Sequence, residues 1–239
     1  MPASTSAPAR GSSPRGQGRL PAGPVAVGVV VAAWVAAIFW AAGTAVWGRG
    51  WLAMGAAAAA TGWHRRRVAA RRPELWTRRA RIGPGTARWD LAWLVIFWPL
   101  VLAAPVAGAI QVVRRGEAAL GGWSVVAGLV LTAAGAALSA RAMVANPFFE
   151  GTVRLQPGQQ VVEGGPYRVV RHPGYAGLAL WVLGPALATG ATAAVTLGLA
   201  AAGWLAVRTA LEDRLLQRGL TGYREYARRV RWRLVPGLW

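Results

Sequence analysis

The residues best suited to chemistry lie together in residues 164–177, whose sequence is GGPYRVVRHPGYAG. Gly165 and His172 each precede a proline, Pro166 and Pro173, which disfavours helical backbone at both positions. We therefore expect a loop here, followed by a helix that begins at Pro173 with His172 as its N-cap. The free amide groups and the positive dipole end of that helix would attract an anion.

Basic and aromatic side chains strengthen this interpretation. Arg168 and Arg171 add fixed positive charge, and Tyr167 and Tyr175 add aromatic faces with hydroxyl groups. The alternative is a basic loop beside a membrane helix that only orients the protein in the bilayer.

A second set of candidate residues lies near the end of the last apolar segment. Arg208 and Glu212 are four residues apart, so they share one face of a helix, and Asp213 adjoins them. An ordinary surface ion pair, which contributes about 0.3 to 0.5 kcal/mol, would suit Arg208 and Glu212 equally well.

Two apolar segments connect these sets of residues. Residues 175–188 and 191–207 are separated only by Thr189 and Gly190, which predicts an antiparallel helical hairpin. Such a hairpin returns the chain to the level of Pro173, so we predict one site built from the loop and the second set of residues.

The composition places these segments in a membrane. Of the 239 residues, 55% are hydrophobic and 15% charged, and the mean hydropathy is +0.36. The 27 basic residues are all arginine and flank apolar segments, so anionic lipid and membrane orientation explain the net charge of +19 better than nucleic acid does. The absence of cysteine excludes thiolate chemistry, and His64 and His172 alone do not make a zinc site, so we expect no metal.

The apolar pattern predicts an all-α polytopic domain with six membrane helices, at residues 25–47, 51–63, 91–113, 120–144, 175–188 and 191–207. The segment 51–63 reaches only about 20 Å, so five helices are the alternative. Six crossings place both termini, the central loop and the arginine-rich loop 65–90 in the cytoplasm. With five crossings the N-terminus would lie outside.

Two polar segments complete the predicted domain. Residues 1–23 are basic and poor in apolar side chains, so we expect a disordered tail before a single domain at 24–239. The segment VRLQPGQQVV, residues 153–162, predicts a small cytoplasmic β-hairpin that turns at Pro157 and Gly158 and covers the central loop.

The ordered set of motifs resembles one family of membrane enzymes. GPYRVVRHPGYAG, the predicted helical hairpin, RTALEDRLL and YREYARRVRWRLVPG are similar to the isoprenylcysteine carboxyl methyltransferase family and its phospholipid methyltransferase relatives. The upstream PELWTRRARI and RWD also resemble the bacterial members. The resemblance covers residues 73–239 and is densest from residue 163 onward.

The resemblance implies an integral membrane methyltransferase of a bacterial cell membrane, which binds S-adenosylmethionine on the cytoplasmic side. We expect its cofactor-binding core at residues 146–239. Carried over by position, the cofactor site would contain loop residues and two acids of the last helix: Gly165, Pro166, Tyr167, Arg171, His172, Tyr175, Glu212 and Asp213. Asp213 departs from the two glutamates that the family usually shows, which argues against a direct role for its shorter side chain.

The chemistry of S-adenosylmethionine fits the same residues. Arg171, His172 and the helix start suit its α-carboxylate, Glu212 suits its α-ammonium, and aromatic faces suit its sulfonium. We predict that the acceptor is a carboxylate on an apolar or lipid-like molecule, because a carboxylate is already ionised and needs no base. Arg208 would hold it in line with the methyl group and is the predicted catalytic residue.

Other functions stay open. An amine acceptor, as in a phospholipid N-methyltransferase, would first need deprotonation by Glu212 or His172. The sterol-reductase families share a GPYR and RHP pattern and the ending RWRLVPGLW, and they use NADPH, but they commonly have a glutamate where Leu178 follows Gly177 here. A non-catalytic membrane protein on the same scaffold is a further alternative. Binding of S-adenosylmethionine, of NADPH or of neither distinguishes these classes.

Overall fold

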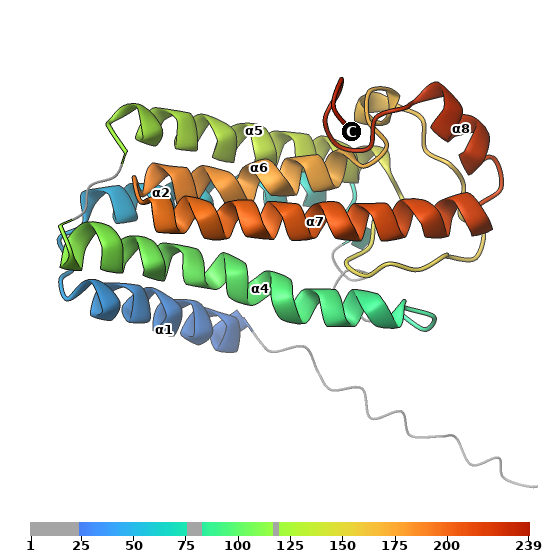
Figure 1. The fold of residues 1–239 in the computed structure, drawn as a ribbon. Helices are drawn as coiled ribbons and strands as arrows, with labels where there is room; N and C mark the ends of the chain where they lie inside the picture. The colour runs from blue at the N-terminus through green and yellow to red at the C-terminus, as the bar shows by residue number, and fades with distance from the viewer. Residues whose placement is uncertain (1–23, 76–82, 117–119) are drawn as a thin grey trace, which may run out of the picture.

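A computed structural model describes residues 24–75, 83–116 and 120–239, with side chains from residue 29 onward. The predicted tail, residues 1–23, lies outside the described residues, as does part of the arginine-rich loop, residues 76–82. The described chain forms a bundle of long helices that lie side by side (Figure 1). The prediction of an all-α domain is confirmed for these residues, since they contain helices and no strand.

The helices have the following bounds. The long ones are α1 (Pro24–Ala42), α2 (Gly48–Ala69), α4 (Arg88–Ala109), α5 (Trp123–Ala145), α6 (Pro173–Ala188) and α7 (Thr192–Gly219), and the short α8 (Tyr223–Arg229) follows. A π-helical turn, η1 (Ile110–Arg114), extends α4, and a 3-10 turn, η2 (Gly165–Arg168), precedes α6. Helix α6 begins at Pro173 with His172 as its N-cap, as the two residue types predict.

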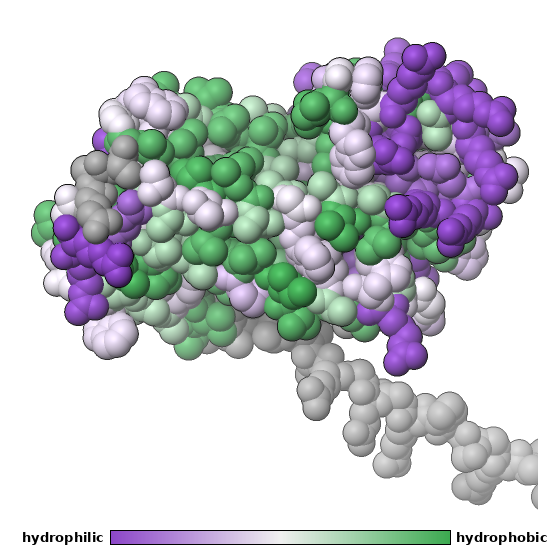
Figure 2. All heavy atoms as spheres, in the orientation of Figure 1, coloured by the Kyte–Doolittle hydropathy of each residue, from purple (hydrophilic) through white to green (hydrophobic). Residues whose placement is uncertain are grey.

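Within the described residues, three helices are long and apolar enough to cross a membrane, namely α4 with its extension (Arg88–Arg114), α5 and α7. Two shorter apolar helices accompany them, Val29–Ala42 within α1 and all of α6. Figure 2 shows apolar side chains over the body of the bundle and hydrophilic ones at the end where α8 lies in Figure 1. The fold fits an integral membrane protein, and the number of crossings, six or five, stays a prediction.

The predicted β-hairpin at residues 153–162 is wrong, because these residues form a loop without strands. The turn itself is present, with a positive φ of 69° at Gly158 and a hydrogen bond from the amide of Gln159 to the carbonyl of Gln156. The flanking backbone binds other groups instead of pairing across the turn. The amide of Val153 donates to Asp90, and the amide of Gln156 donates to the side chain of Gln159.

Two tryptophans fix the register between α4 and α7. Trp93 Nε1 donates to the carbonyl of Trp204 at 2.7 Å, and Trp204 Nε1 donates to the carbonyl of Trp93 at 3.1 Å. Asp90 comes three residues before Trp93, and Arg208 comes four residues after Trp204, so each lies about one helical turn from the pair. The register therefore brings Asp90 and Arg208 together.

Glycines allow α5 and α6 to pack with their backbones in close contact. A Cβ added at Gly135 would lie 2.5 Å from the backbone nitrogen of Trp181, and one at Gly177 would lie 2.6 Å from that of Ser139. Larger residues would push the helices apart. This contact holds the first turn of α6, and with it the loop that precedes Pro173, beside the end of α5.

Candidate cofactor site

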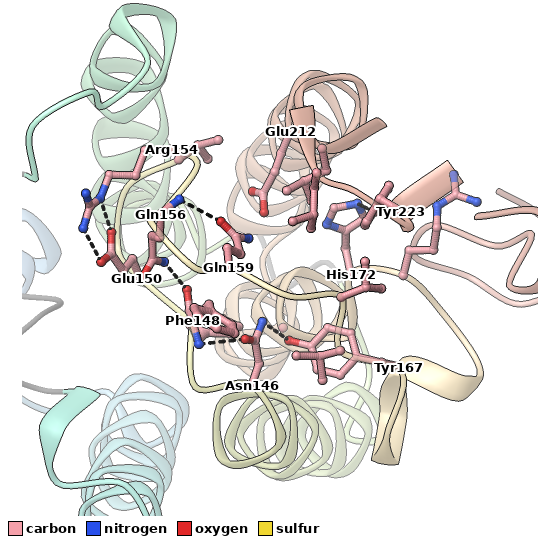
Figure 3. Close-up of a pocket in the computed structure, with 18 of the residues that line it drawn as sticks. Asn146, Phe148, Glu150, Arg154, Gln156, Gln159, Tyr167, His172, Glu212 and Tyr223 are labelled. Atoms are coloured by element: carbon pink, nitrogen blue, oxygen red, sulfur yellow. Dashed lines mark hydrogen bonds and ion pairs between the residues drawn. The ribbon is translucent and has the colours of Figure 1, made fainter. Parts of the chain in front are cut away.

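A cavity opens at the end of the bundle where the polar loops gather (Figure 3). Its volume is about 810 Å³ when the solvent at its open mouth is included. The loop at 146–162 forms one wall, and the opposite wall comes from η2, the start of α6, the end of α7 and the start of α8. Figure 3 shows Gln156 and Gln159 on the first side and Glu212, His172 and Tyr167 on the other.

The structure brings part of the predicted site together around this cavity. The predicted residues that line it are Tyr167, Arg171, His172, Tyr175 and Glu212. Gly165 and Pro166 line a separate groove on the other side of η2. Asp213 and Arg208 do not line the cavity, because their side chains are buried between elements and bound to other residues.

Asp213 is the centre of a buried ionic network. Its side chain is fully buried, and Arg171 contacts both of its oxygens, with Nε 2.8 Å from Oδ1 and Nη2 3.0 Å from Oδ2. The hydroxyl of Tyr223 donates to Oδ1 at 2.9 Å, and Gln217 Nε2 and Arg233 Nε donate to Oδ2 at 2.8 Å and 3.0 Å. Asp213 thus holds α6, α7, α8 and the C-terminal segment together, which gives it a structural role.

Arg171 is committed to the protein by its remaining donors as well. Nη1 donates to the carbonyls of Val230 and Arg231, each at 2.9 Å. The backbone amide of Arg171 also donates to the carbonyl of Trp232 at 2.9 Å. The predicted contact between Arg171 and a cofactor carboxylate would therefore compete with contacts that anchor the C-terminal segment.

His172 lies where the cavity meets this network. Its Nε2 is 3.3 Å from Asp213 Oδ1 and 3.3 Å from the hydroxyl of Tyr223. Its ring stacks on that of Tyr175 with the centroids 5.8 Å apart. The imidazole is thus held at the first turn of α6, and Gly174 lies beside it in the cavity wall.

Glu212 is the acid of the cavity that no described arginine pairs with. The hydroxyl of Tyr175 donates a hydrogen bond to Glu212 Oε2. The other lining carboxylate, Glu150, accepts two hydrogen bonds from Arg154, each of 2.7 Å. Glu212 consequently offers a negative charge to a ligand, whereas the charge of Glu150 is compensated.

Arg208 does not form the surface ion pair with Glu212 that was the alternative for these two residues, because it binds Asp90. Arg208 Nε lies 2.8 Å from Asp90 Oδ1, and Nη2 donates to Oδ2 at 3.1 Å and to the carbonyl of Gly151 at 2.9 Å. Its guanidinium also lies over the ring of Trp93, 4.6 Å from the centroid. Both charges are buried, so each needs the other, and the pair closes α4 onto α7.

Sequence reasoning missed Asp90 and the loop that forms the first cavity wall. Asp90 comes at the end of an arginine-rich loop and was not singled out there. A lone acid at the start of an apolar helix, in RWDLAW, could have indicated a buried ion pair. The loop is held by its own side chains, because Asn146 Nδ2 donates to the hydroxyl of Tyr167 at 3.2 Å and Gln156 Nε2 donates to the carbonyl of Phe148 at 2.6 Å (Figure 3).

The hydroxyl groups of two tyrosines of the site stay protonated over a wide range of pH. Burial raises the pKa of the Tyr167 hydroxyl above its usual value. Burial, together with the charge of Asp213, raises the pKa of Tyr223 in the same direction. Both hydroxyls therefore act as neutral hydrogen-bonding groups and not as bases at neutral pH.

A known protein family matches part of the chain. Residues 123–221 match the family model described as phospholipid methyltransferase. No curated protein matches the chain. The matched region runs from α5 to the end of α7, and it contains every site residue predicted from the sequence, whereas Asp90 and Tyr223 lie outside it.

Proposed function

On the premise that residues 123–221 carry the sequence pattern of the phospholipid methyltransferase family, we propose that the chain is a membrane methyltransferase that depends on S-adenosylmethionine. The family supports the transfer of a methyl group and the apolar helices support the membrane location. The cavity at the end of the bundle is the proposed cofactor site, with an apolar, lipid-like molecule as acceptor.

The position of Glu212 carries the proposal. Its carboxylate lines the cavity, is oriented by Tyr175 and has no arginine partner among the described residues. The α-ammonium of S-adenosylmethionine is a cation of the right kind for such a carboxylate. Glu212 also lies within residues 123–221, which match the family.

The rest of the cofactor would contact the opposite wall. The first turn of α6, at His172 and Gly174, supplies a helix N-terminus for the α-carboxylate. The rings of Tyr167 and Tyr175 supply electron-rich faces for the sulfonium. These side chains would hold the methyl group in line with an acceptor and exclude water, which is most of what an in-line displacement needs.

For the acceptor we propose a carboxylate on an apolar molecule, methylated on oxygen. The site is poor in bases, because Glu212 would be occupied by the cofactor ammonium and His172 is held beside Asp213 and Tyr223. A carboxylate acceptor needs no base. Arg208 would hold it by exchanging Asp90 for the acceptor, so the acceptor must displace a buried ion pair.

The second candidate is an amine of a phospholipid, methylated on nitrogen. The unpaired carboxylate of Glu212 favours a cationic ligand, and Arg208 is bound to Asp90 in the described structure. Glu212 or His172 would then have to serve as the base. The two candidates differ in how their rates depend on pH. An amine must lose a proton before it attacks, whereas a carboxylate is already deprotonated at neutral pH.

The cofactor is tested by calorimetric titration of the purified protein in detergent. We expect binding of S-adenosylmethionine and of its demethylated product, and no binding of NADPH. Glu212→Gln should weaken S-adenosylmethionine binding by about tenfold or more, because a charge-assisted contact is lost. Glu225→Gln, the same change on the exposed surface of α8, is the control and should not change the affinity. Equal affinity in both variants would remove Glu212 from the cofactor site.

The acceptor is tested with two amphiphiles that share an alkyl chain and end in a carboxylate or an amine. We expect a methyl ester as product, with a rate that changes little as the pH rises above the pKa of the carboxylic acid. Arg208→Lys keeps a positive charge beside Asp90 but loses the planar fork, so turnover should fall about tenfold or more while cofactor binding is retained. An N-methylated product whose rate rises toward the pKa of the amine, and is indifferent to this change, would establish the second candidate.

A further inference from the structure

A second hollow lies on the opposite side of η2 from the cofactor cavity. It is a groove between α2 and α5 beside the start of η2, and the residues that line it include Trp63, Arg67, Leu138, Arg141, Gly165 and Pro166. Tyr167, the next residue of η2, lines the cofactor cavity. The groove and the cavity are therefore neighbours that the turn of η2 separates.

Two arginines of the groove carry uncompensated charge. Arg67 and Arg141 are both exposed, and neither has an acidic partner among the described residues. Acids are scarce in this chain, with 8 against 27 basic residues. An anion is therefore the ligand that would complete the groove.

The groove also has a gradient of polarity along the helices. Arg67 lies in the last turn of α2 and Arg141 near the end of α5, so both charges are at helix ends. Trp63 and Leu138 come four and three residues earlier, about one turn further into the bundle, and the remaining lining is alanine, valine, glycine and proline. A tryptophan beside arginines at a helix end is typical of the interface between headgroups and hydrocarbon.

We propose that this groove binds an anionic phospholipid, with its phosphate between Arg67 and Arg141 and one acyl chain along the apolar wall. Charge complementarity selects the anionic headgroup, and the apolar wall beside it selects a lipid over a free anion. The lipid is a bound ligand and not the methyl acceptor, because η2 separates its groove from Glu212. Its headgroup would touch Gly165 and Pro166, so it supports the turn that presents Tyr167 to the cofactor cavity.

The proposal is tested by native mass spectrometry of the full-length protein in detergent with added phosphatidylglycerol or phosphatidylcholine. The wild type should retain phosphatidylglycerol in preference to phosphatidylcholine. Arg67→Gln combined with Arg141→Gln should weaken phosphatidylglycerol binding about tenfold. The control combines Arg66→Gln with Arg218→Gln, which removes the same charge from exposed sites outside the groove and should have little effect.

A second variant tests the acyl chain separately. Leu138→Trp fills the apolar wall and leaves both arginines in place, so it should also weaken retention of phosphatidylglycerol, whereas inorganic phosphate should not compete with the lipid. Equal retention of both lipids, equal loss in the test and control pairs, or full competition by inorganic phosphate would overturn the lipid site. Methylation of the bound phosphatidylglycerol would overturn the assignment as a ligand that is not the acceptor. The lipid measurement does not require enzymatic turnover. A negative result would therefore leave the proposed methyltransferase function unaffected.

Discussion

Glu212 and Asp213 are neighbours on α7, yet their surroundings are opposite. Asp213 is fully buried and accepts hydrogen bonds from arginine, tyrosine and glutamine side chains of several elements. Glu212 lines the open cavity and accepts one hydrogen bond, from Tyr175. Successive residues of a helix point in directions about 100° apart, so one carboxylate can hold the fold together while the next remains free for a ligand.

The largest effect is expected when the structural carboxylate loses its charge. Asp213→Asn leaves Arg171 and Arg233 without their anion, one of them buried. The loss of stability should be about 3 to 5 kcal/mol, as for one partner removed from a buried pair. It is measured by thermal or denaturant unfolding in detergent, and cofactor binding should fall with it. A stable Asp213→Asn protein that binds the cofactor normally would contradict the comparison between the two acids.

A slightly smaller effect is expected at the second buried pair, Asp90 with Arg208. Asp90→Asn should cost about 3 kcal/mol, because Arg208 loses its anion and keeps only uncharged partners, the carbonyl of Gly151 and the ring of Trp93. The variant Arg208→Gln should lose a similar amount of stability. The double variant should lose about 2 kcal/mol less than the sum of the losses of the two single variants. The unfolding free energies of the three variants give this coupling. Additive losses would mean that the two side chains do not interact.

The smallest effects are expected when each of the two acids loses the hydrogen bond from its tyrosine. Tyr175→Phe removes the single donor to Glu212, so it should cost about 1 kcal/mol of stability and should also change the affinity for S-adenosylmethionine severalfold. Tyr223→Phe should cost a similar amount, because Asp213 retains its other donors, and should leave the cofactor affinity within about twofold. Equal effects of both changes on cofactor binding would show that the two acids do not differ in function.

The start of α6 was predictable because the cause is local. Steric restriction before Pro166 and Pro173, and the suitability of proline for a first helical position, act between adjacent residues. The apolar segments were predictable for a similar reason, since composition over a window of residues decides helix formation in a membrane. The helices found in the structure accordingly overlap each of the six apolar segments, and α2 extends beyond the segment 51–63 to Ala69.

The features that the sequence did not predict correctly have a common physical cause, which is competition from partners that are distant along the chain. The turn at Gly158 is present, but the backbone of Val153 is bound by Asp90, so no β-ladder forms. Arg208 shares a helix face with Glu212, yet it pairs with Asp90, which is 118 residues away along the chain.

By itself the sequence determined that this chain is helical, rich in membrane segments and furnished with a polar loop at the start of α6, because these properties follow from contacts between residues close along the chain. Only the tertiary structure decided that Asp213 and Asp90 bind arginines, that Glu212 faces a cavity, and that Gly165 and Pro166 belong to a different groove. A charged side chain can reach several partners of similar chemistry, and the packing register of the helices selects among them.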